Sequence, residues 1–479
     1  MNTPSTRGVT ATAATAATVA LAVLLATNAT GAEDITIRMA VPDHPPNRVM
    51  QELAEERYKA RSGNDVTLEI DFIPWPLYYE RLAASLTSGE RKYQMVVSDS
   101  QWLGTFVEGG YYMKINEFID ADPELQAVFD DPHPNLVAAY SSYPYSSEDY
   151  YGFPQNPEFL IAFYRKDLFC DDGERAAFAA KYGYTLPCTP EEMNDVDWDM
   201  VRDFGEFFRR GRGEQLAGRT VNDDFYGIAY QAAKSYDGAI MEINAFIWQH
   251  GASIWDESKA PKGQAEGVVN SDTAVEALEH YLSFLEYMPP VAKTGTMDPM
   301  KVHELFNQDK VAWIIVYITL AETAIDPRTS KVADKVGFAM HPGVRQADGG
   351  LVRWSNIAGQ PFVFTTWNDD ETVREMLDFV KWWLSEETQI EFARRGFQSG
   401  RRSVYSRPEY VGYRPWNRTF APSLDWQKDL WHVPTFFELL VQAQEEYNKA
   451  ITGQQSARET MDNIAAFQQQ HLSEEGLIE

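Results

Sequence analysis

The sequence predicts an α/β protein built on a parallel, doubly wound sheet. Strand-like and helix-like segments alternate along the first hundred residues, which is the pattern of βαβ units. Further strand-like segments, separated by helical stretches, recur through the rest of the chain. With 479 residues the chain is too long for one ordinary core, so we expect two lobes or domains.

The first three strands and the two helices between them follow from the apolar pattern. Residues 35–41 and 65–73 predict strands, and Met95–Val97 is a short apolar run that fits a strand covered on both faces. Residues 50–61 and 77–86 predict helices, the first of them amphipathic. Strand, helix, strand, helix, strand is the order that a doubly wound sheet requires.

The later elements are predicted in the same way. Strands are expected for the segments "FLIAFYRKDLF", "FYGIAYQ", "VAWIIVYITL", "KVGFAMHPG" and "GQPFVFTT". Helices are expected for residues 271–286 and 371–395, and for most of residues 434–471.

A polar junction follows the third strand. Asp99, Ser100, Gln101 and Trp102 come directly after Met95–Val97 and before a helical segment. Open α/β sheets bind their ligands at the carboxyl ends of the strands. We therefore expect this junction to belong to a ligand site.

The first 32 residues predict a secretory signal peptide. Arg7 precedes an apolar run that is strongest at residues 19–25, and small residues at 30–32 offer a cleavage point. A single membrane anchor is the alternative, which is disfavoured because the apolar core is short for a span. No Cys follows the run, so a lipid anchor is not supported. We expect a soluble protein exported to a bacterial periplasm.

Charge and cysteine content narrow the function classes. The formal net charge of −29 argues against nucleic-acid binding, which needs clusters of Lys and Arg. Cys170 and Cys188 enclose a helix and a turn, and either one local disulfide or two free thiols fits an oxidising compartment.

The sequence contains no recognisable catalytic or cofactor motif. It lacks a phosphate-binding loop, a dinucleotide fingerprint, the H-E-x-x-H and G-x-S-x-G motifs and any cysteine cluster, and its His residues have no i, i+4 pair. We expect no cofactor and no metal. Two carboxylates facing each other across a cleft, as in a glycosidase, stay possible on sequence grounds.

Aromatic residues give the positive signal. The chain has 13 Trp, 24 Tyr and 26 Phe, and Trp75, Trp102 and Trp354 stand in polar, loop-like surroundings, whereas Trp248 is helix-like. Aromatic faces pack on the C–H face of sugar rings, while polar side chains hydrogen-bond the hydroxyls. The set favours a carbohydrate-type cleft, although each Trp alone is equally compatible with a packing role.

The collinear order of several segments resembles a known family. The run from "YYERLAASLTSGERKYQMVVSDSQWLG" through "GFPQNPEFLIAFYRKDLF", "ELFNQDKVAWIIV" and "KVGFAMHPG" to "EMLDFVKWWLSEETQIEFARRG" is similar to the extracellular solute-binding proteins, family 1, of ABC importers, which include maltose-binding protein. The resemblance covers nearly the whole chain after the signal peptide.

The resemblance implies a two-lobed periplasmic-binding-protein fold, type II, with a hinge of three segments that closes on a ligand. Crossings are expected near residues 157–162, 311–315 and 360–363. Lobe one would comprise residues 33–158 and 313–361, and lobe two residues 159–312 and 362–479.

The resemblance also implies the ligand contacts. The matching positions are Asp43, His44, Asp99, Ser100, Gln101, Trp102, Asn156, Glu158, Gln231, Tyr236, Asp237, Trp248, Trp313, Tyr317, Trp354, Asn356 and Arg402. Trp75 is added because of its aromatic face. Arg402 departs from the family pattern, since a Gly stands where relatives often have Pro.

The expected function is a monomeric periplasmic receptor that delivers a sugar, oligosaccharide or polyol to the membrane subunits of an ABC permease, without catalysis. A secreted carbohydrate-active enzyme with paired carboxylates, in which Glu158 would be the residue to examine, is the alternative from another class. A binder of an anionic sugar derivative, held by Arg402 and Arg353, is the alternative within the receptor class.

Overall fold

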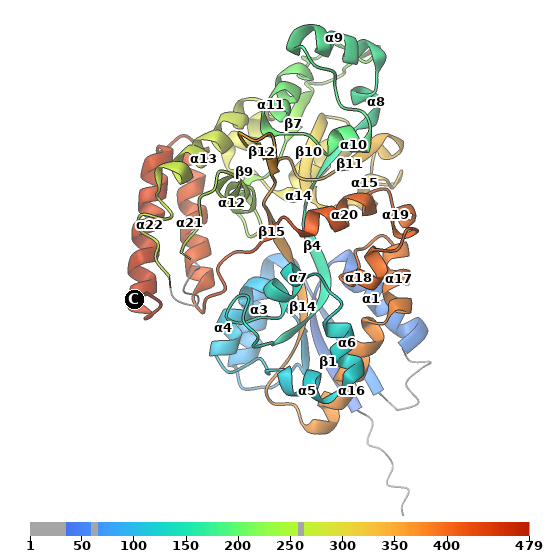
Figure 1. The fold of residues 1–479 in the computed structure, drawn as a ribbon, viewed down its shortest axis with the longest axis vertical. Coiled ribbons are helices and arrows are strands. Elements are labelled where there is room, and N and C mark those ends of the chain that lie inside the picture. Colours follow the sequence, from blue (N-terminus) through green and yellow to red (C-terminus); the bar gives the residue numbers. More distant parts are fainter. Residues whose placement is uncertain (1–34, 59–65, 257–262, 479) are drawn as a thin grey trace, which may run out of the picture.

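A computed structural model describes residues 35–58, 66–256 and 263–478 of the chain. It shows an elongated α/β molecule with two lobes, one above the other in Figure 1. The predicted signal peptide lies outside the described residues. In the described part, no helix is both long enough and apolar enough to cross a membrane.

The sheet of the first lobe (lobe one) is built mainly from the amino-terminal part of the chain. Strands β1 (Ile35–Pro42), β2 (Val66–Ile73) and β3 (Met95–Val97) are parallel, in the order β2-β1-β3. The three strands agree closely with the predicted ones. Helices α1 (Pro45–Leu53) and α3 (Trp75–Thr87) each begin with a proline in the first turn, earlier than predicted.

Two long strands connect the lobes. In strand β4 (Gly152–Arg165) the first residues pair with β14 (Ser355–Phe364), and the last pair with β10 (Val311–Tyr317) and β11 (Val336–Ala339). All residues of β4, β10 and β14 are buried. Figure 1 shows β4 and β14 running along the axis that joins the lobes.

This pairing corrects the predicted division into lobes. Strand β10 is antiparallel to the second half of β4, so residues 313–345 belong to the second lobe (lobe two), not to lobe one. The end of β14 pairs with β3, and helix α16 (Asp370–Trp383) shares an apolar core with β1, so residues 362–384 belong to lobe one. The crossings are therefore β4, β14 and the segment 398–435, and the one expected at 311–315 is wrong.

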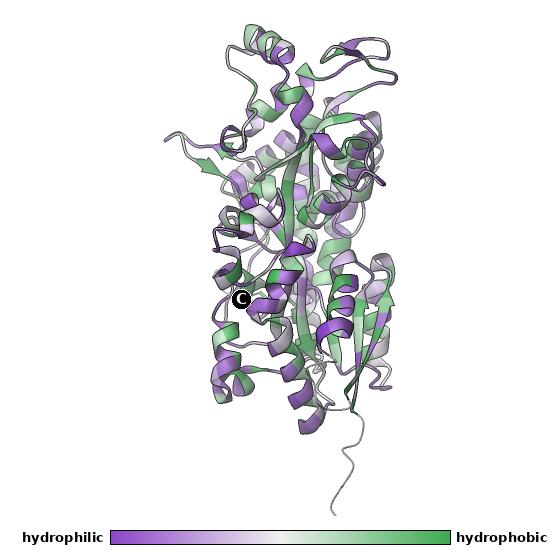
Figure 2. Cartoon of the chain, turned by 90° about the vertical axis from the view of Figure 1, so that its right-hand side faces the viewer, coloured by the Kyte–Doolittle hydropathy of each residue, from purple (hydrophilic) through white to green (hydrophobic). Residues whose placement is uncertain are grey.

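The remaining elements surround the two half-sheets. Lobe one carries α4 (Leu103–Glu108), α5 (Asn116–Ala121), α6 (Pro123–Phe129) and α7 (Pro134–Tyr140). Lobe two contains β7 (Tyr226–Ala229), α9 (Asp172–Tyr182), α11 (Trp198–Phe207), α12 (Ala239–Gln249), α13 (Asp272–Ser283) and α14 (Pro299–Asn307). Figure 2 shows the apolar strands inside and polar helix faces outside.

The carboxyl-terminal part of the chain is mostly helical, as predicted. The helix expected at 371–395 is split into α16 and α17 (Glu386–Arg394), because the Ser385 side chain caps a new helix. Helices α18 (Arg402–Tyr405), α19 (Tyr410–Tyr413) and α20 (Asn417–Leu424) and the short strand β15 (Gln427–Lys428) follow. Then α21 (Phe436–Ile451) and α22 (Ala457–Glu474) form a pair beside lobe two.

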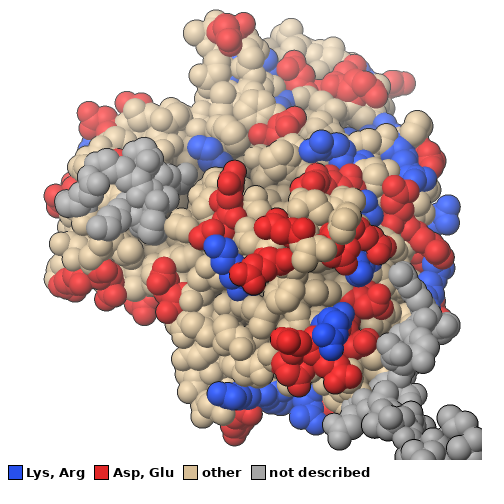
Figure 3. Space-filling model, turned by 60° about the horizontal axis from the view of Figure 1, so that its bottom comes forward, with Lys and Arg blue, Asp and Glu red and all other residues tan. Residues whose placement is uncertain are grey.

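Covalent and charge features agree with the composition. Cys170 and Cys188 form a disulfide, which settles the open choice between a bond and two thiols. Acidic side chains are spread over the face in Figure 3, with Lys and Arg between them. Many form exposed ion pairs such as Arg38 with Glu69, which contribute little to stability.

Candidate functional site

A cavity of about 420 Å³ lies where the two lobes meet beside the hinge strands. Lobe one contributes Asp43, His44, Trp75 and Asp99, and lobe two contributes Tyr236, Asp237 and Tyr317, with Thr319, Pro299 and Met300 beside them. The crossings β4 and β14 contribute Glu158 and residues 358–360. The cavity is therefore enclosed by the parts of the chain that a hinge motion would separate.

Local structure fixes the lobe-one side chains. Asp43 and His44 lie in the turn between the end of β1 and the proline-initiated α1. Trp75 is the first residue of α3, not a loop residue as predicted. Asp99 follows β3 and caps the 3-10 helix Ser100–Trp102 by accepting a hydrogen bond from the Gln101 N–H at 3.3 Å. These positions are carboxyl ends of parallel strands or helix starts, where a sheet presents polar groups.

Hydrogen bonds made by Trp75, Trp102 and Tyr236 cross between the lobes at the cavity. The Trp75 Nε1–H donates to Asp237 Oδ2 at 3.1 Å, and the Trp102 Nε1–H donates to the Tyr236 hydroxyl oxygen at 2.7 Å. The Tyr236 hydroxyl in turn has two acceptors within reach of its hydrogen, Asp99 Oδ2 at 3.1 Å and Gln101 Oε1 at 3.2 Å. Since each bond joins a residue of lobe one to one of lobe two, this arrangement is a closed one.

Aromatic rings form one wall of the cavity. The rings of Trp75 and Trp102 are stacked, with centroids 5.8 Å apart and 16° between planes. The Tyr236 ring meets the Trp75 ring edge-on, with 5.5 Å between centroids. The centroid of the His44 ring lies 5.0 Å from that of Trp75. Trp102 itself is only 1% exposed, so it supports the wall, whereas Trp75 and Tyr236 are part-buried and line the cavity.

Three carboxyl groups of the cavity, those of Glu158, Asp99 and Asp237, have raised pKa values. Burial raises the pKa of Glu158 to about 7, although a hydrogen bond from Thr319 opposes the shift. Burial, with the charge of Asp429, also raises the pKa of Asp99 to about 7. The pKa of Asp237 is raised well above its usual value by burial and by the charges of Asp99 and Glu158.

No Lys or Arg occurs among the described residues that line the cavity. The one basic side chain there is His44, and burial lowers its pKa to about 4, so the ring is neutral near pH 7. The cavity therefore offers hydrogen-bond acceptors and aromatic faces, and no fixed positive charge. Within the described ranges there is also no group of three His, Cys, Asp or Glu residues arranged to hold a metal ion.

The structure brings many of the predicted contact residues together. Asp43, His44, Trp75, Asp99, Glu158, Tyr236, Asp237 and Tyr317 line the cavity. Ser100, Gln101 and Trp102 lie directly behind Asp99 and are fully buried or nearly so. Asn156 is on β4 two residues before Glu158, is fully buried, and has no hydrogen-bond partner for either amide atom in the described part of the chain.

Other predicted contact residues lie elsewhere. Trp313 is 1% exposed within the sheet, opposite Tyr164, because β10 is an interior strand. Arg402 is exposed and borders a surface hollow of lobe one. Gln231, Trp248 and Asn356 are buried outside the lining, and Trp354 lines a second, separate hollow.

Several lining residues were missed from the sequence. Gln360 belongs to β14 and its amide lies 3.5 Å from the His44 ring, while Thr319 follows β10 and contacts Glu158. Met300, in the first turn of α14, is 59% exposed, which is unusual for a large apolar side chain. The crossing predicted at residues 360–363 begins at Gln360, but this residue was not counted among the expected contacts. Nothing in the local sequence indicates Met300.

Comparison with known proteins agrees with this geometry. Residues 42–390 match the family model described as "Bacterial extracellular solute-binding protein". The chain belongs to this solute-binding protein family.

Solved structures of low sequence identity share the fold of this solute-binding protein. One, from Agrobacterium radiobacter K84 in complex with ribitol, is 20% identical, with a TM-score of 0.68 over 91% of this chain and 98% of its own. The maltose-bound MalE3 of T. maritima is 18% identical, with a TM-score of 0.70 over 90% of this chain and 98% of its own. A third, from Agrobacterium vitis S4 with bound D-mannitol, is 16% identical, with a TM-score of 0.69, and covers 92% and 99%.

Proposed function

We propose that this solute-binding protein captures an uncharged polyhydroxylated molecule, a sugar, oligosaccharide or polyol, in the cavity between its lobes. The observation that carries the proposal is the lining itself: aromatic rings and carboxylates from both lobes, without Lys or Arg. Carboxylates accept hydrogen bonds from hydroxyl groups, and aromatic faces pack on the C–H surface of a sugar. The relatives bound to ribitol, maltose and D-mannitol support this class of ligand.

An anionic sugar derivative fits the cavity poorly. Its charge would face the acidic groups of Asp99, Glu158 and Asp237 without a basic partner. Arg353, one of the two arginines considered for this role, is buried and donates to the carbonyl of His341 at 2.7 Å. The other, Arg402, is on the surface.

Ligand capture would work by differential affinity. A molecule that contacts both lobes binds the closed state more tightly than the open one, so it shifts the population toward closure. The bonds from Trp75 to Asp237 and from Trp102 to Tyr236 exist only when the lobes meet. Ligand and cross-lobe hydrogen bonds therefore stabilise the same state.

The family and the amino terminus support a proposed cellular setting. Residues 1–32 would direct export and be removed, and the mature protein would act as a monomer in the periplasm. Its partners would be the membrane subunits of an ABC permease, which would receive the closed, loaded form.

A hydrolytic activity is the competing function. Glu158 and Asp99 both have a pKa near 7, which suits an acid–base catalyst as well as a hydrogen-bonding carboxylate. Binding is favoured because the family consists of binding proteins. Incubation with candidate sugars, followed by product analysis, separates the two, and turnover that is lost in Glu158→Gln would establish the enzyme.

A thermal-shift screen tests the ligand class directly. The purified mature protein is tested with neutral mono- and oligosaccharides, polyols, sugar acids and sulfonated sugars. A ligand that binds only the folded state stabilises it by about 2.7 kcal/mol at a hundredfold excess over its dissociation constant. A shift with a neutral class that is lost in Trp75→Ala supports the proposal, and a shift with anionic sugars alone contradicts it.

A further inference from the structure

Three carboxyl groups from different parts of the fold meet in the 420 Å³ cavity. Asp99 follows β3 of lobe one, Glu158 belongs to the crossing β4, and Asp237 precedes α12 of lobe two. Asp99 is 2% exposed and Glu158 8%, while Asp237 is part-buried. Closure therefore brings acidic groups of both lobes together in a confined space, whereas opening separates Asp99 from Asp237.

Uncharged groups supply the hydrogen bonds of two of these carboxyls. The Trp75 Nε1–H donates to Asp237 Oδ2 at 3.1 Å, and the Thr319 hydroxyl donates to Glu158 Oε1. No Lys or Arg lines the described part of the cavity. Ionised carboxylates that are buried close to like charges and without a basic partner are costly, and a bound proton removes the cost.

The hydrogen bonds around Tyr236 leave a place for one more hydrogen at Asp99. The Tyr236 oxygen accepts from the Trp102 indole at 2.7 Å. The single hydrogen of the Tyr236 hydroxyl has two acceptors, Asp99 Oδ2 at 3.1 Å and Gln101 Oε1 at 3.2 Å. A protonated Asp99 can donate to the Tyr236 oxygen, which leaves the Tyr236 hydrogen for Gln101. Because these contacts join the two lobes, the additional hydrogen stabilises the closed form.

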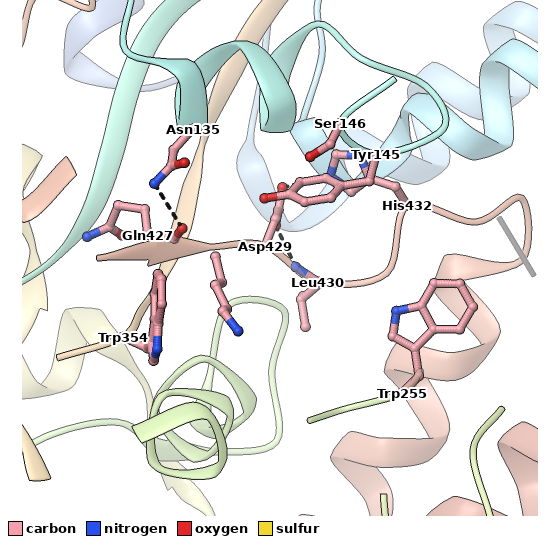
Figure 4. A pocket seen from close by; sticks show the side chains of 10 residues that line it. Asn135, Tyr145, Ser146, Trp255, Trp354, Gln427, Asp429, Leu430 and His432 are labelled. Carbon is pink, nitrogen blue, oxygen red and sulfur yellow. Dashed lines mark hydrogen bonds and ion pairs between the residues drawn. The ribbon is translucent and has the colours of Figure 1, made fainter. Parts of the chain in front are cut away.

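Charged side chains around the cavity do not compensate the three carboxyls. Asp429 adds a further acidic charge, with the His432 ring 2.9 Å from it. Figure 4 shows Asp429 and His432 on the segment that follows β15. The Lys428 ammonium is directed at an indole ring, 4.6 Å from its centroid. At the rim, Asp43 is paired with Arg48 at 2.8 Å, and both are exposed.

The other titratable groups that face the carboxyls stay uncharged near neutral pH. Burial lowers the pKa of His44 to about 4, so this ring is neutral. The rest are tyrosines, and burial raises the pKa of each of them: Tyr78, Tyr112, Tyr140, Tyr236 and Tyr317. Protons are therefore the means by which the closed cavity can reduce its negative charge when the ligand is uncharged.

We propose that closure of the lobes on a ligand is coupled to proton uptake by the carboxyls of Asp99, Glu158 and Asp237. This inference rests on the proposed function, because it takes the 420 Å³ cavity to be the ligand site. An open form lacks the neighbours from the other lobe, so it binds fewer protons than the closed form. A ligand that binds the closed form is then held more tightly at lower pH.

The pH range of the coupling follows from the two states. Burial raises the pKa of Asp99 and of Glu158 to about 7 in the closed form, from ordinary values near 4. The gain in affinity is complete below about pH 4 and is lost as pH rises to about 7. Within this range the affinity changes by about tenfold for each pH unit and each proton taken up.

Isothermal titration calorimetry on the mature protein tests the coupling, with glucose, ribitol, D-mannitol and maltose as separate probes at about pH 5.5, 6.5 and 7.5. At the middle pH each probe is measured in two buffers of different ionisation enthalpy, because the difference between the two heats gives the number of protons taken up. Binding that is lost in Trp75→Ala is assigned to the 420 Å³ cavity.

Variants Asp99→Asn and Asp237→Asn replace a carboxyl by an amide of nearly the same shape, which does not take up a proton. Asp203→Asn is the matched control. Burial also raises the pKa of Asp203, which accepts a hydrogen bond from Tyr184 at 3.0 Å within lobe two and does not line the cavity. Asp237→Asn decides if Asp99→Asn does not fold, since Asp237 is part-buried.

For a probe that binds the cavity we expect uptake of about one proton at the middle pH, and at least about tenfold tighter binding at the lowest pH than at the highest. Asp203→Asn should behave like the parent protein, while Asp99→Asn and Asp237→Asn should show a smaller change with pH.

Binding to the cavity without proton uptake, or a pH dependence that both Asp99→Asn and Asp237→Asn retain in full, overturns the coupling and leaves the proposed function standing. Proton release with tighter binding at higher pH also overturns it, and indicates a positively charged ligand. If no probe binds, the proposed function fails and the coupling fails with it.

Discussion

The Tyr236 hydroxyl occupies the centre of the contact between the lobes, and its removal should weaken closure. In Tyr236→Phe the ring remains, but the Trp102 Nε1–H loses its acceptor at 2.7 Å and Asp99 Oδ2 loses its partner at 3.1 Å. Trp102 and Asp99 are 1% and 2% exposed, so water does not easily replace the lost hydroxyl in the closed form. In an open form Tyr236 of lobe two no longer reaches either group, so the substitution does not change their partners there.

The size of the effect follows from the cost of leaving a buried polar group unpaired. Such a loss amounts to about 1–3 kcal/mol, and it falls on the closed state alone. Since a ligand binds through the closed state, its affinity should fall by about 5- to 150-fold. The free energy of unfolding should change less, because the lobes retain their own cores.

Calorimetry with the ligand found in the thermal-shift screen measures the affinity, and small-angle X-ray scattering measures the radius of gyration without ligand. The matched control is Tyr184→Phe. The Tyr184 hydroxyl donates to Asp203 at 3.0 Å, and both residues belong to lobe two, so this variant loses a hydrogen bond that closure does not affect. An affinity of Tyr236→Phe equal to that of Tyr184→Phe would refute the reasoning.

Three further predictions concern pH, the hinge and the disulfide. Burial raises the pKa values of Asp99 and Glu158 to about 7, so both groups hold protons in the folded state that the unfolded state releases near pH 4. Their contribution to stability should be fully present below about pH 4 and be lost as pH rises to about 7. Melting curves of the double variant Asp99→Asn with Glu158→Gln should therefore lose less stability over this range than those of the parent protein, and an equal loss would contradict the prediction. Gly359 has φ +110°, and a Cβ at this position would lie 2.5 Å from a carbonyl oxygen of β4, so a larger residue there is strained. Gly359→Ala should therefore lower the free energy of unfolding by about 1–3 kcal/mol in urea titrations. An unchanged unfolding midpoint would contradict the expected strain. The double variant Cys170→Ser with Cys188→Ser should lose about 2–4 kcal/mol of stability. Its ligand affinity should be unchanged, because neither cysteine lines either hollow. A changed affinity would contradict this prediction.

Local patterns predicted the elements of lobe one and the junction after β3. The apolar run of β3 and the polar residues from Asp99 to Trp102 are adjacent in sequence, so their roles at a strand end could be inferred without knowing any distant contact. Trp75 was identified from its polar neighbours, although it begins a helix.

Non-local pairing limited the rest of the prediction. Strands β10 and β14 are both apolar runs, and nothing local shows that β14 spans the lobes while β10 stays in one. The contact between Tyr236 and Asp99 joins residues 137 positions apart, so only the fold creates it. Trp354 was correctly recognised as unusual, but the sequence could not show that it borders a different hollow from Trp75.

The place of β14 in the sheet affects the order in which the chain can fold. Strand β14 lies between β3 and β4, so the lobe-one sheet lacks an interior strand until Phe364 has been synthesised. The aromatic and aliphatic side chains of α16 that cover β1 arrive later still. A nascent chain therefore cannot complete lobe one early, since loop closure over such separations is slow. With residues 1–32 acting as the proposed export signal, late completion of lobe one would leave the nascent chain unfolded for longer while it is exported.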